Sequence, residues 1–249
     1  MDLNADLGEG FGIWRLGDDE ALLDLVTSAN VACGFHAGDA ATMRRVCAAA
    51  AERAVTVGAQ VGYRDLPGFG RRRIDYAFAD LRDEVIYQIG ALDAFCRVAG
   101  TAVRYVKPHG ALYNTAAVDE THAAAVVAAV IDYDPTLAVL CLPGSVLAQL
   151  AAGAGLRVVA EGFADRGYLS NGTLVPRPSA GALLASAADV VTRAVRLAVQ
   201  RTVVAVDGSV VPCPVQSICL HGDTTDAVTL ARRVRDALAD AGVTLSPFA

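Results

Sequence analysis

Lysine is almost absent from this sequence: Lys107 is the single lysine, and arginine supplies all the other cationic side chains among the 21. The sequence also lacks any apolar run close to the ~20 residues that a membrane-spanning helix needs. Its longer apolar stretches cover only residues 123–131 and 137–142. Residues 1–6 have neither the basic nor the apolar region of a signal peptide. We therefore expect a cytoplasmic protein that does not contact a membrane.

Acidic residues outnumber basic ones: the chain has 27 Asp plus Glu and 21 Lys plus Arg, which gives a net charge of −6. This balance argues against nucleic acid as a partner. Hydrophobic residues make up 54% of the chain and charged residues 19%, which supports a large core and excludes a disordered chain. No linker or low-complexity tract divides the 249 residues, so we expect one domain over residues 1–249.

Several nucleotide and hydrolase motifs are missing. A P-loop needs a lysine followed by Ser or Thr, but Lys107 is followed by Pro108. The segment that begins at Gly8 has Ile13 where a dinucleotide fingerprint needs its third glycine. The sequence also has no Gly-x-Ser-x-Gly elbow, which argues against a serine hydrolase of that type. We therefore do not expect the chain to bind ATP or NAD through these motifs.

The six cysteines form neither a Cys-x-x-Cys pair nor a zinc-ribbon spacing. Most of them stand in apolar patterns, where a free cysteine behaves as a small hydrophobic residue. We therefore expect buried, reduced thiols rather than a disulfide framework. They are Cys33, Cys47, Cys96, Cys141, Cys213 and Cys219.

Short β-branched runs alternate with segments of helical period along the chain. This rhythm predicts an α/β fold with a parallel sheet covered by helices, either a barrel or a doubly wound sheet. Asp207-Gly208 lies between two β-rich runs and indicates a hairpin inserted before the last strand. The expected strands are 1–6, 28–33, 56–61, 103–107, 137–142, 157–161 and 216–220, and the expected helices are 18–27, 40–53, 80–99, 119–131, 145–152, 187–200 and 225–241.

Polar residues gather directly after these expected strands. Three of the four histidines stand there, namely His36, His109 and His221. Because the carboxyl ends of parallel strands meet on one face, we expect these side chains to share one pocket. Together with nearby carboxylates they could bind a divalent metal or act as acid and base. The carboxylates are Asp6, Asp39, Glu161 and Asp223.

The spacings suggest which carboxylate orients which histidine. His36-x-x-Asp39 and His221-x-Asp223 each suit a histidine with an orienting carboxylate. The fourth histidine, His122, stands at the start of an expected helix, and we expect it on the surface.

The rare lysine stands two residues before a candidate catalytic histidine. Alternation along a strand places Lys107 and His109 on the same side. There the ammonium group could bind a carboxylate or a phosphate, or stabilise an oxyanion. The three arginines at residues 71–73 are compatible with anion capture or with an ordinary solvated loop.

Six ordered blocks of the sequence resemble the LamB/YcsF family. They read DLNADLGEG at residues 2–10, SANVACGFHAGD at 28–39, KPHGALYN at 107–114, FADRGY at 163–168, LVPR at 174–177 and CLHGD at 219–223. The resemblance implies a seven-stranded, TIM-like β/α barrel related to polysaccharide deacetylase and glycoside hydrolase barrels. It also implies hydrolysis of the lactam of 5-oxo-L-proline to L-glutamate within an ATP-dependent 5-oxoprolinase complex, in which two other subunits use the ATP.

The resemblance and the convergent polar residues together suggest roles for individual side chains. Water activation falls to Asp6 and His36 with Asp39, and stabilisation of the carbonyl or phosphoryl group to Lys107 and His109. His221 with Asp223 would act as a further acid or ligand, and Arg177 would hold the substrate carboxylate. A divalent metal, if one binds, would use Asp6, His36 and His109. The expected substrate-binding residues are Asn4, Glu9, Gln60, Asn114, Glu161, Arg166 and Arg177.

One residue departs from the family pattern. The third-strand block reads Gly58-Ala59-Gln60-Val61, where the family usually has Gly-Ala-His-Pro, and an amide cannot accept a proton near neutral pH. The departure keeps two alternatives open, a non-catalytic scaffold or regulatory subunit of the same complex and a stand-alone metal-dependent amidohydrolase or deacetylase. A homo-oligomer is also open.

Overall fold

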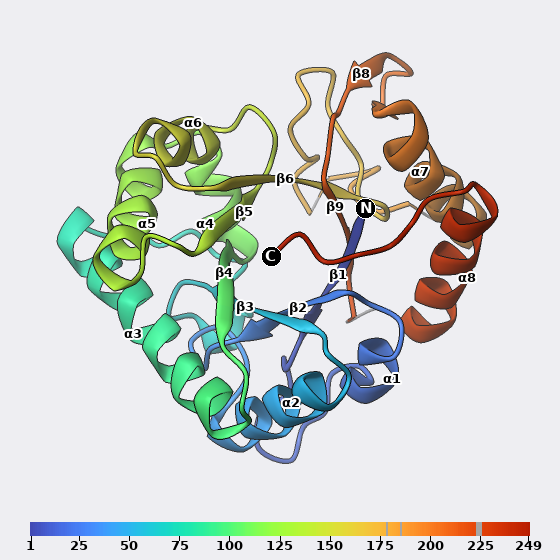
Figure 1. Ribbon diagram of the computed structural model, residues 1–249. Coiled ribbons are helices and arrows are strands. Elements are labelled where there is room, and N and C mark those ends of the chain that lie inside the picture. The colour runs from blue at the N-terminus through green and yellow to red at the C-terminus, as the bar shows by residue number, and fades with distance from the viewer. Residues whose placement is uncertain (178, 185, 223–225) are drawn as a thin grey trace.

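A computed structural model describes residues 1–177, 179–184, 186–222 and 226–249 of the chain. Seven parallel strands close into a barrel in the order β1-β2-β3-β4-β5-β6-β9 (Figure 1). The last strand closes the barrel because it pairs with both β1 and β6. The strands are β1 (Asp2–Leu7), β2 (Ser28–Ala32), β3 (Thr56–Val61), β4 (Val103–Pro108), β5 (Ala138–Cys141), β6 (Val158–Phe163) and β9 (Ser217–Leu220).

Helices surround the barrel and bury their apolar sides against it. Polar caps begin several of them, as where the Ser145 hydroxyl accepts a hydrogen bond from the Ala148 amide at 3.1 Å. The helices are α1 (Asp19–Leu23), α2 (Ala40–Glu52), α3 (Phe78–Val98), α4 (Gly110–Ala116), α5 (Glu120–Tyr133), α6 (Val146–Gly153), α7 (Ala187–Gln200) and α8 (Ala227–Asp240). A short 3-10 turn, η1 (Leu66–Gly68), follows β3, and an antiparallel ribbon of β7 (Thr202–Val204) and β8 (Val210–Pro212) precedes β9.

The predicted fold class, all seven expected strands and the inserted hairpin are confirmed. Helix α4 was not predicted, because Pro108, which ends β4, and Gly110, which begins the helix, are residues typical of loops. The expectation for His122 was wrong: it is 3% exposed, and its Nδ1 lies 2.7 Å from the Tyr63 hydroxyl oxygen. The six cysteines are buried and free, as expected. Among the described residues, no helix has the length and apolar character that crossing a bilayer requires.

A buried polar layer fills the middle of the barrel. The Asn4 amide, on β1, donates to Glu161 Oε1 at 3.0 Å and to Ser217 Oγ at 2.7 Å. Asn30, on β2, donates to Asn4 Oδ1 at 2.7 Å and accepts from the Tyr105 hydroxyl at 2.7 Å. These hydrogen bonds offset the cost of burying polar groups and fix the inward side chains of neighbouring strands.

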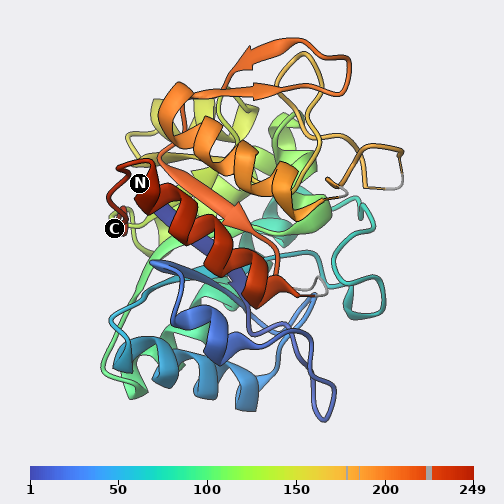
Figure 2. The ribbon, with the colours of Figure 1, turned by 90° about the vertical axis from the view of Figure 1, so that its right-hand side faces the viewer.

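The C-terminal segment covers the end of the barrel at which the strands begin (Figure 1). The ring of Phe248 packs edge-on against Tyr105 with 4.9 Å between ring centroids. The Met1 amino group donates to the Thr244 carbonyl oxygen at 2.9 Å, which ties the first strand to the same segment. Both termini therefore lie at one end of the barrel (Figure 2), and the carboxyl ends of the strands form the other.

Candidate active site

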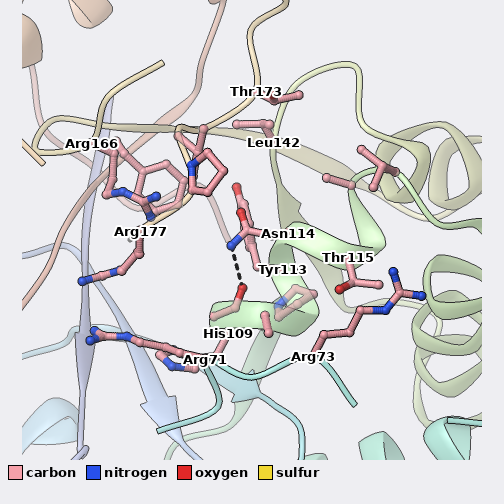
Figure 3. A pocket seen from close by; sticks show the side chains of 18 of the residues that line it. Arg71, Arg73, His109, Tyr113, Asn114, Thr115, Leu142, Arg166, Thr173 and Arg177 are labelled. Carbon is pink, nitrogen blue, oxygen red and sulfur yellow. Dashed lines mark hydrogen bonds between the residues drawn. The ribbon is translucent and has the colours of Figure 1, made fainter. Parts of the chain in front are cut away.

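A pocket of about 470 Å³ opens at the carboxyl ends of the strands, a size typical of small-molecule sites. Its apolar lining includes Leu142 and Phe163, and charged side chains surround its mouth (Figure 3). Seven of the residues predicted for the site line it, namely Asp6, Lys107, His109, Asn114, Arg166, Arg177 and His221.

Two carboxylates neutralise the only lysine at the floor of this pocket. Lys107 Nζ lies 2.8 Å from Glu161 Oε1 and 3.1 Å from Asp6 Oδ1. Burial by itself would lower the pKa of Lys107, but these carboxylates outweigh it and raise the pKa well above its usual value. The ammonium group therefore stays charged while its positive charge is balanced inside the protein.

The Asp6 carboxylate is held in its ionised form. Burial favours the protonated acid, but the Lys107 ammonium and the imidazoles of His221 and His109 oppose that effect and hold the pKa of Asp6 below its usual value. The Asn30 amide also donates to Asp6 Oδ1 at 2.8 Å. Asp6 thus presents a fixed negative charge to the pocket.

His36 and His109 stack face to face beside the pocket, with 3.9 Å between ring centroids and 8° between planes. The Gln60 amide joins them, since its Oε1 lies 3.1 Å from His36 Nε2 and its Nε2 lies 3.0 Å from His109 Nδ1. The same Gln60 nitrogen donates to Glu9 Oε1 at 3.3 Å. Because a carboxylate repels an amide oxygen, the contact with Glu9 fixes which way the Gln60 amide faces.

This network sets the protonation of both imidazoles. The Gln60 oxygen accepts a hydrogen bond from the N–H group at His36 Nε2, whereas the Gln60 nitrogen donates a hydrogen bond to the unprotonated Nδ1 of His109. The other nitrogen of His109, Nε2, lies 3.0 Å from the Phe69 carbonyl oxygen and donates to it. Burial lowers the pKa of His36 to about 4 and that of His109 well below its usual value. Both rings are therefore neutral near pH 7.

The predicted metal set, Asp6, His36 and His109, is not the set that the structure brings together. Glu9, His36 and His109 offer ligand atoms within 4.8 Å of one another. Asp6 Oδ2 lies 4.0 Å from His109 Nδ1, and Asp6 pairs with Lys107 instead. The Gln60 N–H group points at two of the three prospective ligands, and a cation and an N–H donor cannot share the same lone pairs. The three ligand atoms are close enough together to hold a metal ion, but the ion would have to displace the Gln60 N–H group from Glu9 and His109.

Two pairings of a histidine with a carboxylate were predicted. The pairing of His36 with Asp39 is wrong, and the pairing of His221 with Asp223 cannot be compared with the structure because Asp223 lies outside the described residues. Asp39 begins helix α2, where it accepts hydrogen bonds from the Thr42 and Gly12 amides, each at 2.7 Å, so it does not orient His36. The carboxylate that orients His221 is Asp165, whose Oδ2 lies 2.7 Å from His221 Nδ1. Burial favours protonated Asp165, but His221 opposes it and the net effect lowers the pKa of Asp165.

Several predicted residues lie below or beside the pocket rather than on its lining. Asn4 and Glu161 belong to the buried layer inside the barrel. His36 lies against Gly62 and Gly70 of the loop that follows β3, and the buried Gln60 joins it to Glu9. These five residues are therefore placed to support the pocket wall. That they contact the substrate directly remains a prediction.

Sequence reasoning missed two residues of the site. Asp165 was overlooked because it stands 56 positions from His221, although β6 and β9 are paired neighbours in the barrel. Tyr113 lines the pocket from α4, and burial raises the pKa of its hydroxyl well above the usual value. A signal for Asp165 was present, because its block FADRGY directly follows an expected strand.

The fold and the site define a β/α-barrel protein with a charged pocket at the carboxyl ends of its strands. A family 4 carbohydrate esterase from Streptomyces lividans shares this fold, with a TM-score of 0.50, 13% identity, and coverage of 100% of this chain and 92% of that one. The LamB/YcsF family pattern matches residues 1–249, so the chain belongs to the LamB/YcsF family, as its sequence blocks predicted.

Close relatives carry more specific names. The chain is 61% identical over 249 residues to the A subunit of 5-oxoprolinase from Streptomyces avermitilis, with 100% of both chains covered. It also superposes on the crystal structure of a lactam utilization protein from Thermus thermophilus with a TM-score of 0.93 and 42% identity, with 99% of both chains covered.

Proposed function

We propose that this chain is the subunit of an ATP-dependent 5-oxoprolinase in which water opens the lactam of 5-oxo-L-proline to give L-glutamate. One observation carries the proposal: an ionised carboxylate, a histidine–aspartate pair and several arginines face a single pocket of small-molecule size. The names of the similar proteins, the A subunit of 5-oxoprolinase and a lactam utilization protein, support the same substrate class.

Opening a lactam needs a base, a stabilised oxyanion and a proton for the leaving nitrogen. The water oxygen bonds to the ring carbonyl carbon, the C–N bond breaks, and the nitrogen takes up a proton. We assign the water proton to His221, because Asp165 holds the proton on Nδ1 and so selects the tautomer with its lone pair on Nε2. Lys107 lies at the pocket floor, and we assign to its ammonium group, which Asp6 and Glu161 hold in place, a hydrogen bond to the oxygen that becomes negative.

The use of ATP is assigned to two partner subunits. The sequence lacks the P-loop and the dinucleotide fingerprint, so the energy of ATP reaches this chain through an activated substrate or through its partners. The arrangement around Gln60 supports a reaction that needs no metal from the Glu9, His36 and His109 cluster.

The direct test is glutamate release from 5-oxoproline and ATP by this chain reconstituted with its two partner subunits. We expect activity in the wild type, because Gln60 satisfies the same imidazoles that a histidine would contact. Activity only in the Gln60→His variant would contradict catalysis by the natural chain. If neither the wild type nor the Gln60→His variant released glutamate, the assignment of 5-oxoproline as substrate would be contradicted.

The amide of Gln60 also favours a second candidate function, a non-catalytic scaffold subunit of the same complex. In that case the barrel would bind the partner subunits, and a His221→Ala variant would leave glutamate release unchanged. A stand-alone metal-dependent amidohydrolase would instead contain a stoichiometric divalent ion in a purified sample. Glutamate release that falls with His221→Ala in a metal-free sample would exclude both alternatives.

A further inference from the structure

Two cysteine thiols are in contact between helices α2 and α3, which lie side by side on the outside of the barrel (Figure 1). The sulfur atoms of Cys47, on α2, and Cys96, on α3, are 3.7 Å apart. Neither residue has any exposed surface. Within the described part of the chain, this is the only contact between two of the six free thiols.

The separation of the two sulfur atoms is close to what a disulfide needs. An S–S bond is about 2.05 Å long, so the atoms would have to approach by roughly 1.7 Å. Side-chain rotation and a small displacement of the two helices can supply a movement of that size. Within the ranges that the structure describes, no third His, Cys, Asp or Glu atom lies within 4.8 Å of both sulfur atoms. The pair therefore lacks the further ligands of a metal site and fits a disulfide better.

The surroundings make the two thiols chemically unequal. The hydrogen bond with Cys47, burial and the negative charge of Asp93, one turn earlier on α3, raise the pKa of Cys96. The hydrogen bond that Cys96 donates lowers the pKa of Cys47, although burial opposes this effect. Burial instead raises the pKa of Cys213 to about 11 and that of Cys141 to about 12. Because the thiolate is the reactive form, Cys47 is the thiol disposed to react first, and Cys96 is the second.

A surface groove opens one helical turn away from this pair. Its volume is about 520 Å³, and its walls include Met43 on α2 and both Tyr87 and Ala91 on α3. Met43 lies four residues before Cys47, so the two side chains are neighbours on the same face of α2. A small oxidant in the groove is therefore about one helical turn from Cys47. A slight separation of α3 from α2 would complete the path.

We propose that Cys47 and Cys96 form a reversible disulfide when the protein meets a peroxide. The Cys47 thiolate attacks one oxygen of hydrogen peroxide, the O–O bond breaks, and hydroxide leaves and takes up a proton. Cys47 is then a sulfenic acid. The Cys96 sulfur bonds to the Cys47 sulfur, the S–OH bond breaks, and the hydroxyl group leaves with the Cys96 proton as water. Two thiols are oxidised, and one hydrogen peroxide is reduced to two molecules of water.

The disulfide would enclose a segment that supports the histidine pair. Residues 48–95 contain β3, which carries Gln60, and the loop in which Gly70 packs against His36. A cross-link that closes a long loop stabilises a protein mainly by restricting the unfolded chain. We therefore expect the oxidised protein to resist unfolding, while the bond prevents irreversible oxidation of Cys47. The site lies outside the pocket, and the inference does not depend on the proposed function.

Peptide mapping of the full chain after treatment with hydrogen peroxide tests the proposal. Alkylation of the unfolded protein counts its free thiols, and we expect six before treatment and four afterwards, with two peptides joined through Cys47 and Cys96. Dithiothreitol should restore all six thiols. The oxidised protein should melt roughly 5–10 °C above the reduced protein, and the difference should disappear on reduction.

Two variants distinguish the thiol that attacks from the thiol that completes the bond. Cys96→Ser should stop the reaction at the sulfenic acid of Cys47, which dimedone traps as a stable adduct. Cys47→Ser should leave Cys96 as an unmodified thiol under the same treatment. Cys213→Ser is the matched control, because Cys213 is also buried but does not contact another thiol, and it should form the disulfide as the wild type does. Melting temperatures of the reduced variants show whether each one is folded.

The wild-type map alone can overturn the proposal, even if a variant does not fold. Six free thiols that persist after a model thiol peptide in the same solution is fully oxidised would overturn it. A disulfide between Cys33 and Cys47 would also overturn it, as would irreversible oxidation of Cys47 without a link to Cys96. A linked protein that melts no higher than the reduced one would contradict the stabilising role. None of these readouts requires glutamate release, so their outcome is separate from that of the proposed function.

Discussion

At the scale of single residues, the protonation states in the site depend on which buried polar groups are hydrogen-bonded to one another. Asp165 and His221 are 2.7 Å apart and both buried, so the carboxylate decides which imidazole nitrogen carries the proton. An amide at position 165 can donate to Nδ1, which would select the opposite tautomer. We expect Asp165→Asn to lower glutamate release by the reconstituted complex by roughly a hundredfold or more.

The control for this prediction is Asp207→Asn, in the exposed turn of the β7–β8 hairpin. That variant should retain wild-type activity. If Asp165→Asn folded normally and also retained it, His221 would not be the base.

His36 links the stability of the protein to pH. Burial lowers its pKa to about 4 in the folded protein, from a usual value of 6.5. The unfolded chain therefore binds a proton that the folded protein does not. The contribution of His36 to the free energy of unfolding is complete above about pH 6.5 and is lost as the pH falls from about 6.5 toward 4.

Urea unfolding at about pH 7.5, 6 and 5 measures this dependence, and we expect a total loss of a few kcal/mol. The His36→Asn variant removes one titrating group and should show a shallower decline, with His109 accounting for part of what remains. Equal slopes for the wild type and the variant would mean that His36 does not titrate differently on unfolding.

At the scale of elements, the loop after η1 holds the histidine pair in place. Gly70 has φ +64°, and a Cβ there would lie 2.7 Å from His36 Cβ and 3.0 Å from His109 Cδ2. Gly100 has a similar φ of +75° but no heavy atom within 4 Å. We expect Gly70→Ala to reduce the free energy of unfolding by roughly 1–3 kcal/mol more than Gly100→Ala, because both share the backbone cost and only Gly70 meets a packed neighbour.

Denaturant unfolding of the two variants checks this difference. Similar losses of stability in both variants would show that the loop moves away from the histidines at little cost.

The same scale explains what the sequence could and could not predict. The alternation of β-branched and helical segments located all seven strands, because burial on both faces leaves a continuous apolar pattern. Residue blocks at the strand ends located Asp6, Lys107 and His221 in the pocket. Sequence spacing could not show that Asp165 faces His221, since their contact depends on how β6 and β9 are paired in the closed barrel.

At the scale of the whole molecule, the barrel has one open and one covered end. The Phe248 ring packs on Tyr105, and the Arg157 guanidinium group donates to the Phe248 carbonyl oxygen. We expect Phe248→Ala to lower the free energy of unfolding by roughly 1–3 kcal/mol, since it removes an aromatic contact from a partly buried site. Pocket ligands should bind as before, because the site lies at the other end of the barrel.

The control is Ile13→Ala, which truncates a side chain that is 90% exposed and should change stability by less than about 0.5 kcal/mol. Thermal and urea unfolding compare the two variants. A Phe248→Ala protein as stable as the wild type would show that the C-terminal segment merely rests on the barrel.

The solitary lysine gives the chain an unusual chemical property. Lys107 Nζ is paired with Asp6 and Glu161, and the residue is 2% exposed at the floor of the pocket, so amine-reactive reagents should acylate it slowly in the folded protein. Acylation of Lys107 then requires Nζ to leave its two carboxylates. Mass spectrometry of labelled peptides would therefore time that separation with a reporter that the natural sequence already contains, and a pocket ligand should slow the labelling further.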